Sequence, residues 1–161
     1  AHASRLDDEA SRLAKGGDVE RWREVWHGGW IATEGRRRSW PEEVLRKNDE
    51  TTLIQRQNFR KAHDAGVTIV FGSDAGVYPH GMNARQFAYM VQWGMAPMEA
   101  IKAATSVAAS YLKDGQRLGA LRPGMLGDVI AVAGDPLRDI SVLENVDTGI
   151  RGGLVFKAPN E

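Results

Sequence analysis

The stretch that decides the fold is "GVTIVFGSDAGVYPHG", residues 66–81. Its first part is a run of five β-forming residues, 67–71, enclosed by two glycines. A continuous run of this kind predicts a strand buried on both faces, as in parallel sheets, because a half-exposed strand would alternate apolar and polar residues. Asp74 follows three residues after the run. The stretch therefore places a carboxylate just beyond the carboxyl end of a buried strand.

Helical patterns flank this strand on both sides. Two helices are predicted before it, over residues 41–48 with Ser39 as the cap, and over 50–64. Two more follow, one over residues 84–91 with Asn83 as its cap, and one that runs without interruption over 97–112. The alternation of helix, buried strand, polar loop and helix predicts a parallel α/β fold.

The N-terminal region is less regular. A short helix is expected over residues 4–15, whereas residues 18–40 contain no apolar or alternating run that would predict a strand. Trp22, Trp26 and Trp30 recur at helical spacing, but the glycine pair 28–29 is expected to end such a helix before Trp30. A packing role for these tryptophans is favoured over stacking on a ligand.

The pattern changes near residue 118. A Pro-Gly turn at 123–124 precedes a predicted strand over 129–133, and the segment around the glycine pair 152–153 predicts a hairpin. Short strands separated by turns are typical of an antiparallel or mixed sheet. We therefore predict a domain boundary near residue 118.

Composition excludes several classes of function. Lys and Arg number 21, and so do Asp and Glu, so net charge gives no reason to expect a nucleic acid or an anionic membrane as partner. The absence of cysteine excludes disulfides, thiolate metal sites and a cysteine nucleophile. No window has the roughly 18 apolar residues of a membrane span, and the first residues lack a signal-peptide pattern. A cytoplasmic protein is expected, although the chain begins at Ala1 without an initiator methionine.

Asp74 is the main candidate for chemistry. In parallel α/β folds reactive groups lie just past the carboxyl ends of strands, where a carboxylate can bind a metal ion or act as a general base. The alternative is that Asp74 only caps its turn through backbone amides. His80 is a possible ligand, substrate contact or loop residue, while His27 and His63 have weaker claims. Phosphate-binding loops, HExxH, a GxSxG elbow and an HxH pair are all absent from the sequence.

Residues 66–105, "GVTIVFGSDAGVYPHGMNARQFAYMVQWGMAPMEAIKAAT", resemble the last barrel strand and following helices of the metal-dependent amidohydrolase superfamily, in particular its imidazolonepropionase-like and Xaa-Pro or Xaa-Arg dipeptidase-like members. The turn "GSDAG", the "HGMN" element and the helix start "APMEA" carry the resemblance, with Ala96 replacing the usual capping hydroxyl. Residues 118–143, "LGALRPGMLGDVIAVAGDPLRDISVL", are similar to the return from the barrel to a small β-sandwich, with Gly127 replacing an alanine. "AHASRLDDEASRLAK", residues 1–15, resembles the segment that carries a metal-binding histidine after barrel strand six.

The resemblance implies a fold and a reaction. Residues 1–118 would be the C-terminal part of a (β/α)8 barrel, and 119–161 the return strands of the β-sandwich. The intact enzyme would hydrolyse amide or peptide C–N bonds of small substrates with a divalent metal, in the first instance Zn²⁺. Asp74 would be a metal ligand and the catalytic residue, and His2 a second ligand. His80 and Asn83 would shape the substrate pocket.

Two departures from the family pattern leave an alternative open. Residues 18–30, where the seventh barrel strand is expected, are charged and rich in tryptophan. The family's HxH pair, bridging lysine or glutamate and strand-five histidine would precede Ala1, so most metal ligands lie outside this chain. The alternative is a truncated or degenerate, catalytically incomplete chain that acts through self-association or partner binding. Its uncovered strand edges and apolar faces would favour a homo-oligomer.

Overall fold

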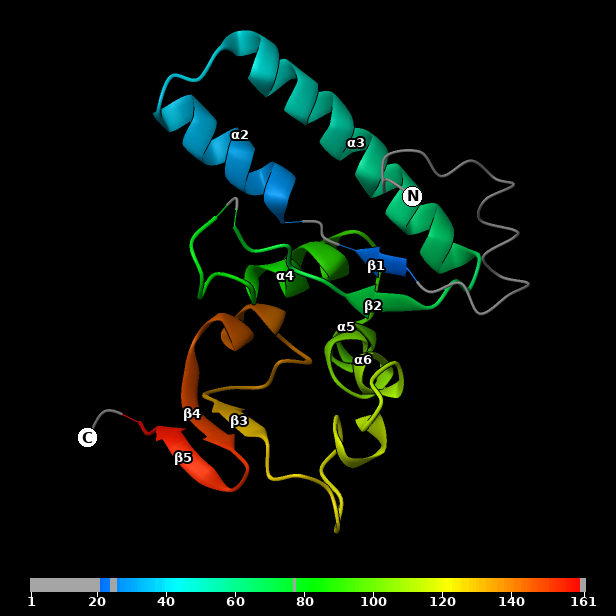
Figure 1. Cartoon of the computed structure of the whole chain (residues 1–161). Helices are drawn as coiled ribbons and strands as arrows, with labels where there is room; N and C mark the ends of the chain where they lie inside the picture. The colour runs from blue at the N-terminus through cyan, green and yellow to red at the C-terminus, as the bar shows by residue number, and fades with distance from the viewer. Residues whose placement is uncertain (1–20, 24–25, 77, 160–161) are drawn as a thin grey trace.

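The computed structural model describes residues 21–23, 26–76 and 78–159 (Figure 1). The helix predicted over residues 4–15 and the candidate ligand His2 lie outside the described residues. Within them the chain has an α/β fold with two sheets, one of two parallel strands and one of three antiparallel strands. The helices lie around the parallel pair, and the three-stranded sheet lies beyond them toward the C-terminus (Figure 1).

The decisive stretch forms β2 (Ile69–Phe71), whose central residue Val70 is fully buried. It pairs in parallel with β1 (Arg21–Arg23), so that Arg23 lies opposite Phe71. The predicted buried, parallel strand is therefore confirmed, although it is two residues shorter than expected. No apolar or alternating run in residues 18–40 predicted a strand, whereas the family resemblance placed one within 18–30, and β1 lies in that range. β1 is a three-residue segment that pairs through backbone groups, which hydrophobic periodicity does not register.

The helix α2 (His27–Arg37) contains the glycine pair that was predicted to break it. The prediction was wrong because tight packing requires the two glycines. A Cβ on Gly28 would collide with the Thr52 side chain, and one on Gly29 would collide with the Tyr89 hydroxyl. Trp26 lies just before the helix and is only 5% exposed, which confirms its packing role.

The helix α3 (Glu42–Asp64) is a single helix of 23 residues, not the two that were predicted. Neither glycine nor proline occurs between the two predicted segments, so nothing in the chain ends the first of them. Pro41, and not Ser39, occupies the N-cap position. At the other end Gly66 adopts a positive φ of 74°, as predicted for a helix C-terminus.

Three short helices follow β2, namely α4 (Arg85–Gln92), α5 (Pro97–Ala104) and α6 (Ser106–Ser110). The uninterrupted helix predicted over 97–112 was wrong, because the chain leaves helical geometry at Thr105, with φ −123° and ψ −96°. The Thr105 hydroxyl donates to the Ile101 carbonyl at 2.8 Å, a bond that bends helices. The cap predicted at Asn83 was also misplaced, since Ala84 precedes α4.

The main hydrophobic core lies between β2 and the helices α3, α4 and α5. It contains seven buried residues: Phe59, Ile69, Met90, Trp93, Met95, Ala100 and Ala103. The rings of Phe59 and Trp93 meet edge to face, with their centroids 5.8 Å apart. This core fixes β2 from one side and so determines where the loop after it begins.

The C-terminal sheet has the order β3 (Val129–Val132), β4 (Val146–Arg151), β5 (Leu154–Lys157), and all its pairs are antiparallel. The 3₁₀ helices η1 (Gly115–Arg117) and η2 (Ile140–Glu144) lie before β3 and before β4. Gly152 and Gly153 have positive φ values of 57° and 81°, the signature of the two-residue turn that joins tight hairpins. The hairpin predicted from these two glycines is confirmed. None of the helices within the described residues has the length and apolar character needed to cross a membrane.

Candidate functional site

Asp74 lies in the turn that follows β2, and its side chain is exposed. Its backbone has a φ of +43°, in the left-handed region that few residues other than glycine, asparagine and aspartate adopt. The described residues donate no hydrogen bond to its carboxylate. A capping aspartate would accept bonds from nearby backbone amides, so the turn-cap alternative finds no support. The carboxylate at the strand end is therefore available as an oxygen ligand for a metal ion.

Side chains from the same loop hold this turn in place. The Tyr78 hydroxyl donates to the Ser73 carbonyl at 2.5 Å, and the Asn83 amide donates to the Ser73 hydroxyl at 2.9 Å. The Asn83 carbonyl oxygen also accepts from the backbone N–H of Gly81 at 3.2 Å. The structure thus places Asn83 behind the turn, in contact with the residue that precedes Asp74.

Gln86 is a site residue that sequence reasoning missed. It is fully buried in α4, and its Oε1 accepts from the backbone N–H of Trp26 at 2.9 Å. Its Nε2 donates to the carbonyl of Gly72 at 2.5 Å. Trp26 follows β1 and Gly72 follows β2, so one side chain joins the carboxyl ends of both strands. The available signal was a glutamine among the apolar residues of the helix that follows the Asp74 loop.

His27 opens α2 and lies within electrostatic reach of Asp74. Burial lowers the pKa of the His27 imidazole, and the Asp74 carboxylate partly offsets this by favouring the charged form. His27 had only a weak claim from the sequence, because no element was predicted for its segment. The pairing of β1 with β2 is what brings the two side chains to the same edge.

A pocket of about 370 Å³ opens beside this turn. Two segments line it: the α2 side contributes Trp30, Glu34, Arg38 and Trp40, and the loop after β2 contributes Gly76, Tyr78, Pro79 and His80. The structure therefore places His80 in a pocket wall, and Asn83 does not line it. Gly76 follows Asp74 by two residues, so the pocket wall begins within about 7 Å of Asp74, measured between their Cα atoms.

The described residues hold only part of any metal site. No group of three or more His, Cys, Asp or Glu side chains with metal-binding geometry occurs among them. His63 is directed elsewhere, since its Nε2 lies 3.3 Å from the Glu99 carboxylate. The Asp74 carboxylate fits a divalent metal as one hard oxygen ligand, because it accepts no hydrogen bond within the described part of the chain.

Known proteins resemble this chain in sequence and in structure. The ochratoxinase of Aspergillus niger is 41% identical over 106 residues, which are 63% of this chain and 22% of the relative's length. A solved Xaa-Pro dipeptidase with methionine bound in its active site superposes with a TM-score of 0.88 and 39% identity, covering 98% of this chain and 39% of the dipeptidase. The solved A. niger ochratoxinase gives a TM-score of 0.77 and 31% identity, covering 99% of this chain and 36% of that protein.

These matches cover most of this chain but well under half of each relative. The chain spans about a fifth of the length of the curated ochratoxinase and about two fifths of the dipeptidase. The sequence pattern of the Amidohydrolase family matches residues 29–155, which include the Asp74 turn, the pocket and the three-stranded sheet up to the first half of β5. The chain belongs to the amidohydrolase family.

Proposed function

We propose that this chain is the C-terminal part of a metal-dependent hydrolase of amide or peptide C–N bonds, with Asp74 as its catalytic residue. The observation that carries the proposal is the state of Asp74 itself. The residue follows a buried parallel strand, has a left-handed backbone, and its carboxylate accepts no hydrogen bond from the described residues. Left-handed backbone outside glycine is concentrated at functional sites, where the surrounding structure holds it in place.

In this proposal β1 and β2 are neighbouring strands of a (β/α)8 barrel, and residues beyond about 118 belong to a β-sandwich. Parallel pairing and helices packed on β2 support the assignment. In such a site a divalent metal, in the first instance Zn²⁺, would acidify the attacking water. Asp74 and His2 would be two of its ligands, and the others would come from outside this chain.

The residues of this chain would then perform two tasks. Asp74 accepts the proton of the attacking water and passes it to the nitrogen of the departing amine, which leaves as the C–N bond breaks. His80, in the pocket wall, contacts the substrate, and Asn83 keeps the turn in position through Ser73. The relatives include a dipeptidase, so dipeptides and N-acyl amino acids are the substrates to try first. A cytoplasmic location stays a prediction.

The test combines metal analysis with a hydrolysis assay. Because the proposal places the other metal ligands outside this chain, the assay uses the intact enzyme of which the chain would be part. The intact enzyme is dialysed against a chelator, and its Zn²⁺ content is measured after reloading. Turnover of a panel of dipeptides and N-acyl amino acids is then followed with and without the metal. Stoichiometric metal together with metal-dependent release of the free amine supports the proposal. Metal-independent turnover contradicts it, and absence of both points to the second candidate below.

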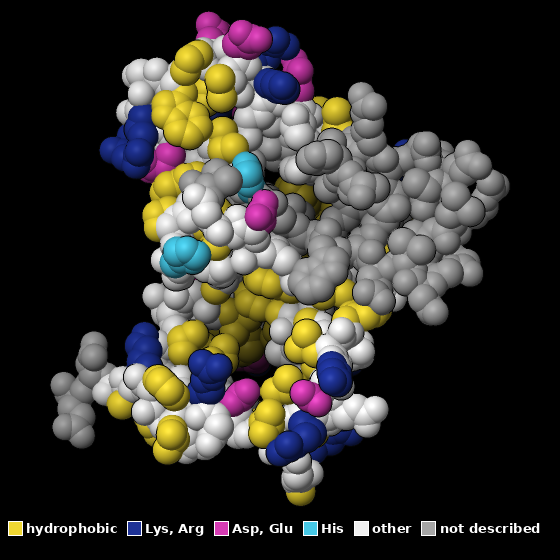
Figure 2. Space-filling view, in the orientation of Figure 1, with side chains coloured by type: hydrophobic (Ala, Val, Ile, Leu, Met, Phe, Trp, Pro, Cys, Tyr) yellow, Lys and Arg dark blue, Asp and Glu magenta, His cyan; other side chains and the backbone are white. Residues whose placement is uncertain are grey.

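The second candidate is a catalytically incomplete chain that self-associates. Large apolar side chains on the C-terminal sheet favour it: Leu154, Val155 and Phe156 of β5 are 69%, 62% and 73% exposed. Hydrophobic side chains also gather around a hollow between β2 and this sheet (Figure 2). Clusters of exposed apolar side chains on a sheet edge mark contact surfaces. Sedimentation at micromolar concentration separates the cases, because a monomer argues against this candidate.

A further inference from the structure

The pocket beside Asp74 combines one positive charge with aromatic walls. Trp30 and Trp40 reach it from the α2 side, Tyr78 and His80 from the loop after β2. Its volume of about 370 Å³ is within the range of small-molecule sites, which run from about 300 to 1,000 Å³. Arg38 is the cation in this lining, and Glu34 is its carboxylate. The charge on the ligands that this pocket can bind therefore depends on how far the neighbours of Arg38 neutralise its positive charge.

Glu34 is shared by two guanidinium groups, Arg37 and Arg38, and one carboxylate cannot neutralise both. Arg37 donates to both carboxylate oxygens of Glu34, through Nε at 2.9 and 3.1 Å and through Nη2 at 2.6 Å. The hydrogen bond from Arg37 is the first cause that lowers the pKa of Glu34, and the hydrogen bond from Arg38 lowers it further, so this carboxylate is charged and faces two guanidinium groups. The three side chains together carry one net positive charge, and Arg38 is the arginine of the two that lines the pocket.

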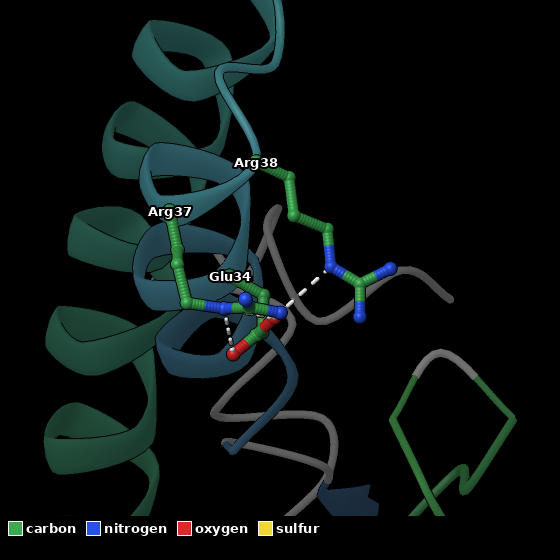
Figure 3. A network of polar contacts seen from close by, with 3 residues as sticks. All are labelled: Glu34, Arg37 and Arg38. Atoms are coloured by element: carbon green, nitrogen blue, oxygen red, sulfur yellow. Dashed lines mark hydrogen bonds and ion pairs between the residues drawn. The ribbon is translucent and has the colours of Figure 1, made fainter.

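Arg38 also has unused hydrogen-bonding capacity. Only its Nε contacts Glu34, at 3.0 Å, and within the described residues its two terminal nitrogens make no other hydrogen bond. Figure 3 shows Arg37 folded back along the helix onto Glu34, whereas the Arg38 guanidinium extends away from the helix with its terminal nitrogens directed outward. An arginine whose two terminal nitrogens are free presents donors that match a carboxylate.

We propose that this pocket is an anion-selective subsite, in which Arg38 pairs with a carboxylate of the substrate and the two tryptophans contact a flat ring attached to it. The proposal rests on the proposed function, since it names the class of amide to be cleaved: an amide that carries a free carboxylate and an aromatic or similarly flat apolar group. The indole faces provide the apolar contact, and the guanidinium provides selectivity for charge. Arg38 and Trp40 are then specificity residues for the reaction at Asp74.

The experiment measures binding and needs neither metal nor turnover. The probes are N-acetyl-phenylalanine and its C-terminal amide, which have nearly the same shape and differ by one negative charge. Their affinities for the full chain are compared by calorimetry in the wild type, in Arg38→Gln and in Arg36→Gln. Arg36 is the matched control, because it lies on the same helix but pairs with Asp49 at 2.6 Å and does not line the pocket. Circular dichroism verifies that each variant is folded.

The acid should bind the wild-type chain at least about tenfold more tightly than the amide, which corresponds to one carboxylate–guanidinium pair. Arg38→Gln should remove this preference, and Arg36→Gln should keep it. Trp40→Leu should weaken both probes by a similar factor. Equal affinity for acid and amide, no binding of either, or a preference that survives Arg38→Gln overturns the proposal. Loss of hydrolysis in an Asp74 variant with intact binding would leave it standing, so the two proposals fail separately.

Discussion

The buried side chain of Gln86 accepts a hydrogen bond from the backbone N–H of Trp26 at 2.9 Å, although 60 residues separate the two in sequence. The other end of the same amide donates to Gly72, at the end of β2. Gln86 thereby fixes the distance between the loops that carry His27 and Asp74. Because Gln86 and Trp26 are both buried, the Trp26 N–H depends on this side chain for its hydrogen bond, and the partly buried Gly72 carbonyl depends on it in part.

Replacing Gln86 by leucine should destabilise the protein. The substitution keeps the side-chain volume close to that of glutamine but leaves the buried N–H of Trp26 and the partly buried carbonyl of Gly72 without this partner. At about 1–3 kcal/mol for the buried N–H and less for the partly buried carbonyl, the free energy of unfolding should fall by about 2–4 kcal/mol. Urea unfolding followed by tryptophan fluorescence measures it. Gln92→Leu, at the exposed end of α4, is the control and should change little. An equal effect of both variants would show that the amide is dispensable.

Asp74→Asn should separate catalysis from folding. Asparagine tolerates the left-handed backbone that Asp74 adopts at φ +43°, so the turn and the melting temperature should be kept. An amide cannot accept the proton of the attacking water, and turnover by the intact enzyme should fall by about 10²–10⁴-fold. Asp64→Asn, an exposed carboxylate at the end of α3, serves as control. Near-normal turnover in Asp74→Asn would remove Asp74 from the mechanism.

Gly28→Ala should destabilise α2 even though alanine is the better helix former. The change gains up to about 1 kcal/mol of helix propensity, but the new methyl collides with Thr52 and the overpacking costs about 1–3 kcal/mol. In a Thr52→Ala background the same change should cost less, because the nearest atom, Oγ1, is gone. A double-mutant cycle on the free energy of unfolding measures this coupling. Additive effects would mean that the two helices adjust without contact.

Ala96→Thr should stabilise the start of α5. Ala96 occupies the N-cap position with an extended backbone, and the Glu99 carboxylate accepts from its N–H at 2.9 Å. Alanine has no side-chain acceptor, so only one half of a capping box is present. A threonine hydroxyl would complete it and add about 1 kcal/mol. Ala96→Val has the same shape without the hydroxyl. If both variants raise the melting temperature equally, capping is not the cause.

Glu99 should make stability depend on acid. The hydrogen bond from the Ala96 N–H, followed by the contact with His63, lowers the pKa of Glu99 below its usual 4.5. A carboxyl with a lowered folded-state pKa contributes stability that is present above the unfolded value and is lost as the pH falls through the folded value. The difference in unfolding free energy between wild type and Glu99→Gln should therefore shrink between about pH 6 and about pH 3. A difference that is constant over this range would contradict the assignment.

Local patterns predicted the parts of the fold that local chemistry determines. The run 67–71 predicted a buried strand, the glycine pair 152–153 predicted a hairpin, and Gly66 predicted a helix end. Tertiary contacts decided the rest. β1 exists because its backbone pairs with β2, and α2 continues through Gly28 because Thr52 approaches it closely. Neither relation leaves a trace in a window of ten residues.

The residues of the candidate site likewise fall into two groups, those that local sequence patterns identify and those that only tertiary contacts bring to the site. Asp74 was identifiable from its place after a strand, and His80 from its place in the following loop. Arg38, Trp40 and His27 come from a segment whose structure the sequence did not reveal, and they join the site only when α2 lies beside the loop after β2. Their roles depend on distances between segments that are far apart in the sequence, and a single sequence taken alone does not supply these distances.

The left-handed backbone at Asp74 also bears on how such a protein would change over generations. Asparagine and glycine adopt that conformation readily, and each is one nucleotide change away from aspartate. Either replacement would remove the carboxylate while the turn and the core around β2 stay folded. Selection for stability alone would therefore not oppose the loss of the reaction. A descendant that had lost its chemistry in this way would still fold and persist, with Asn or Gly at this position as the mark of the change.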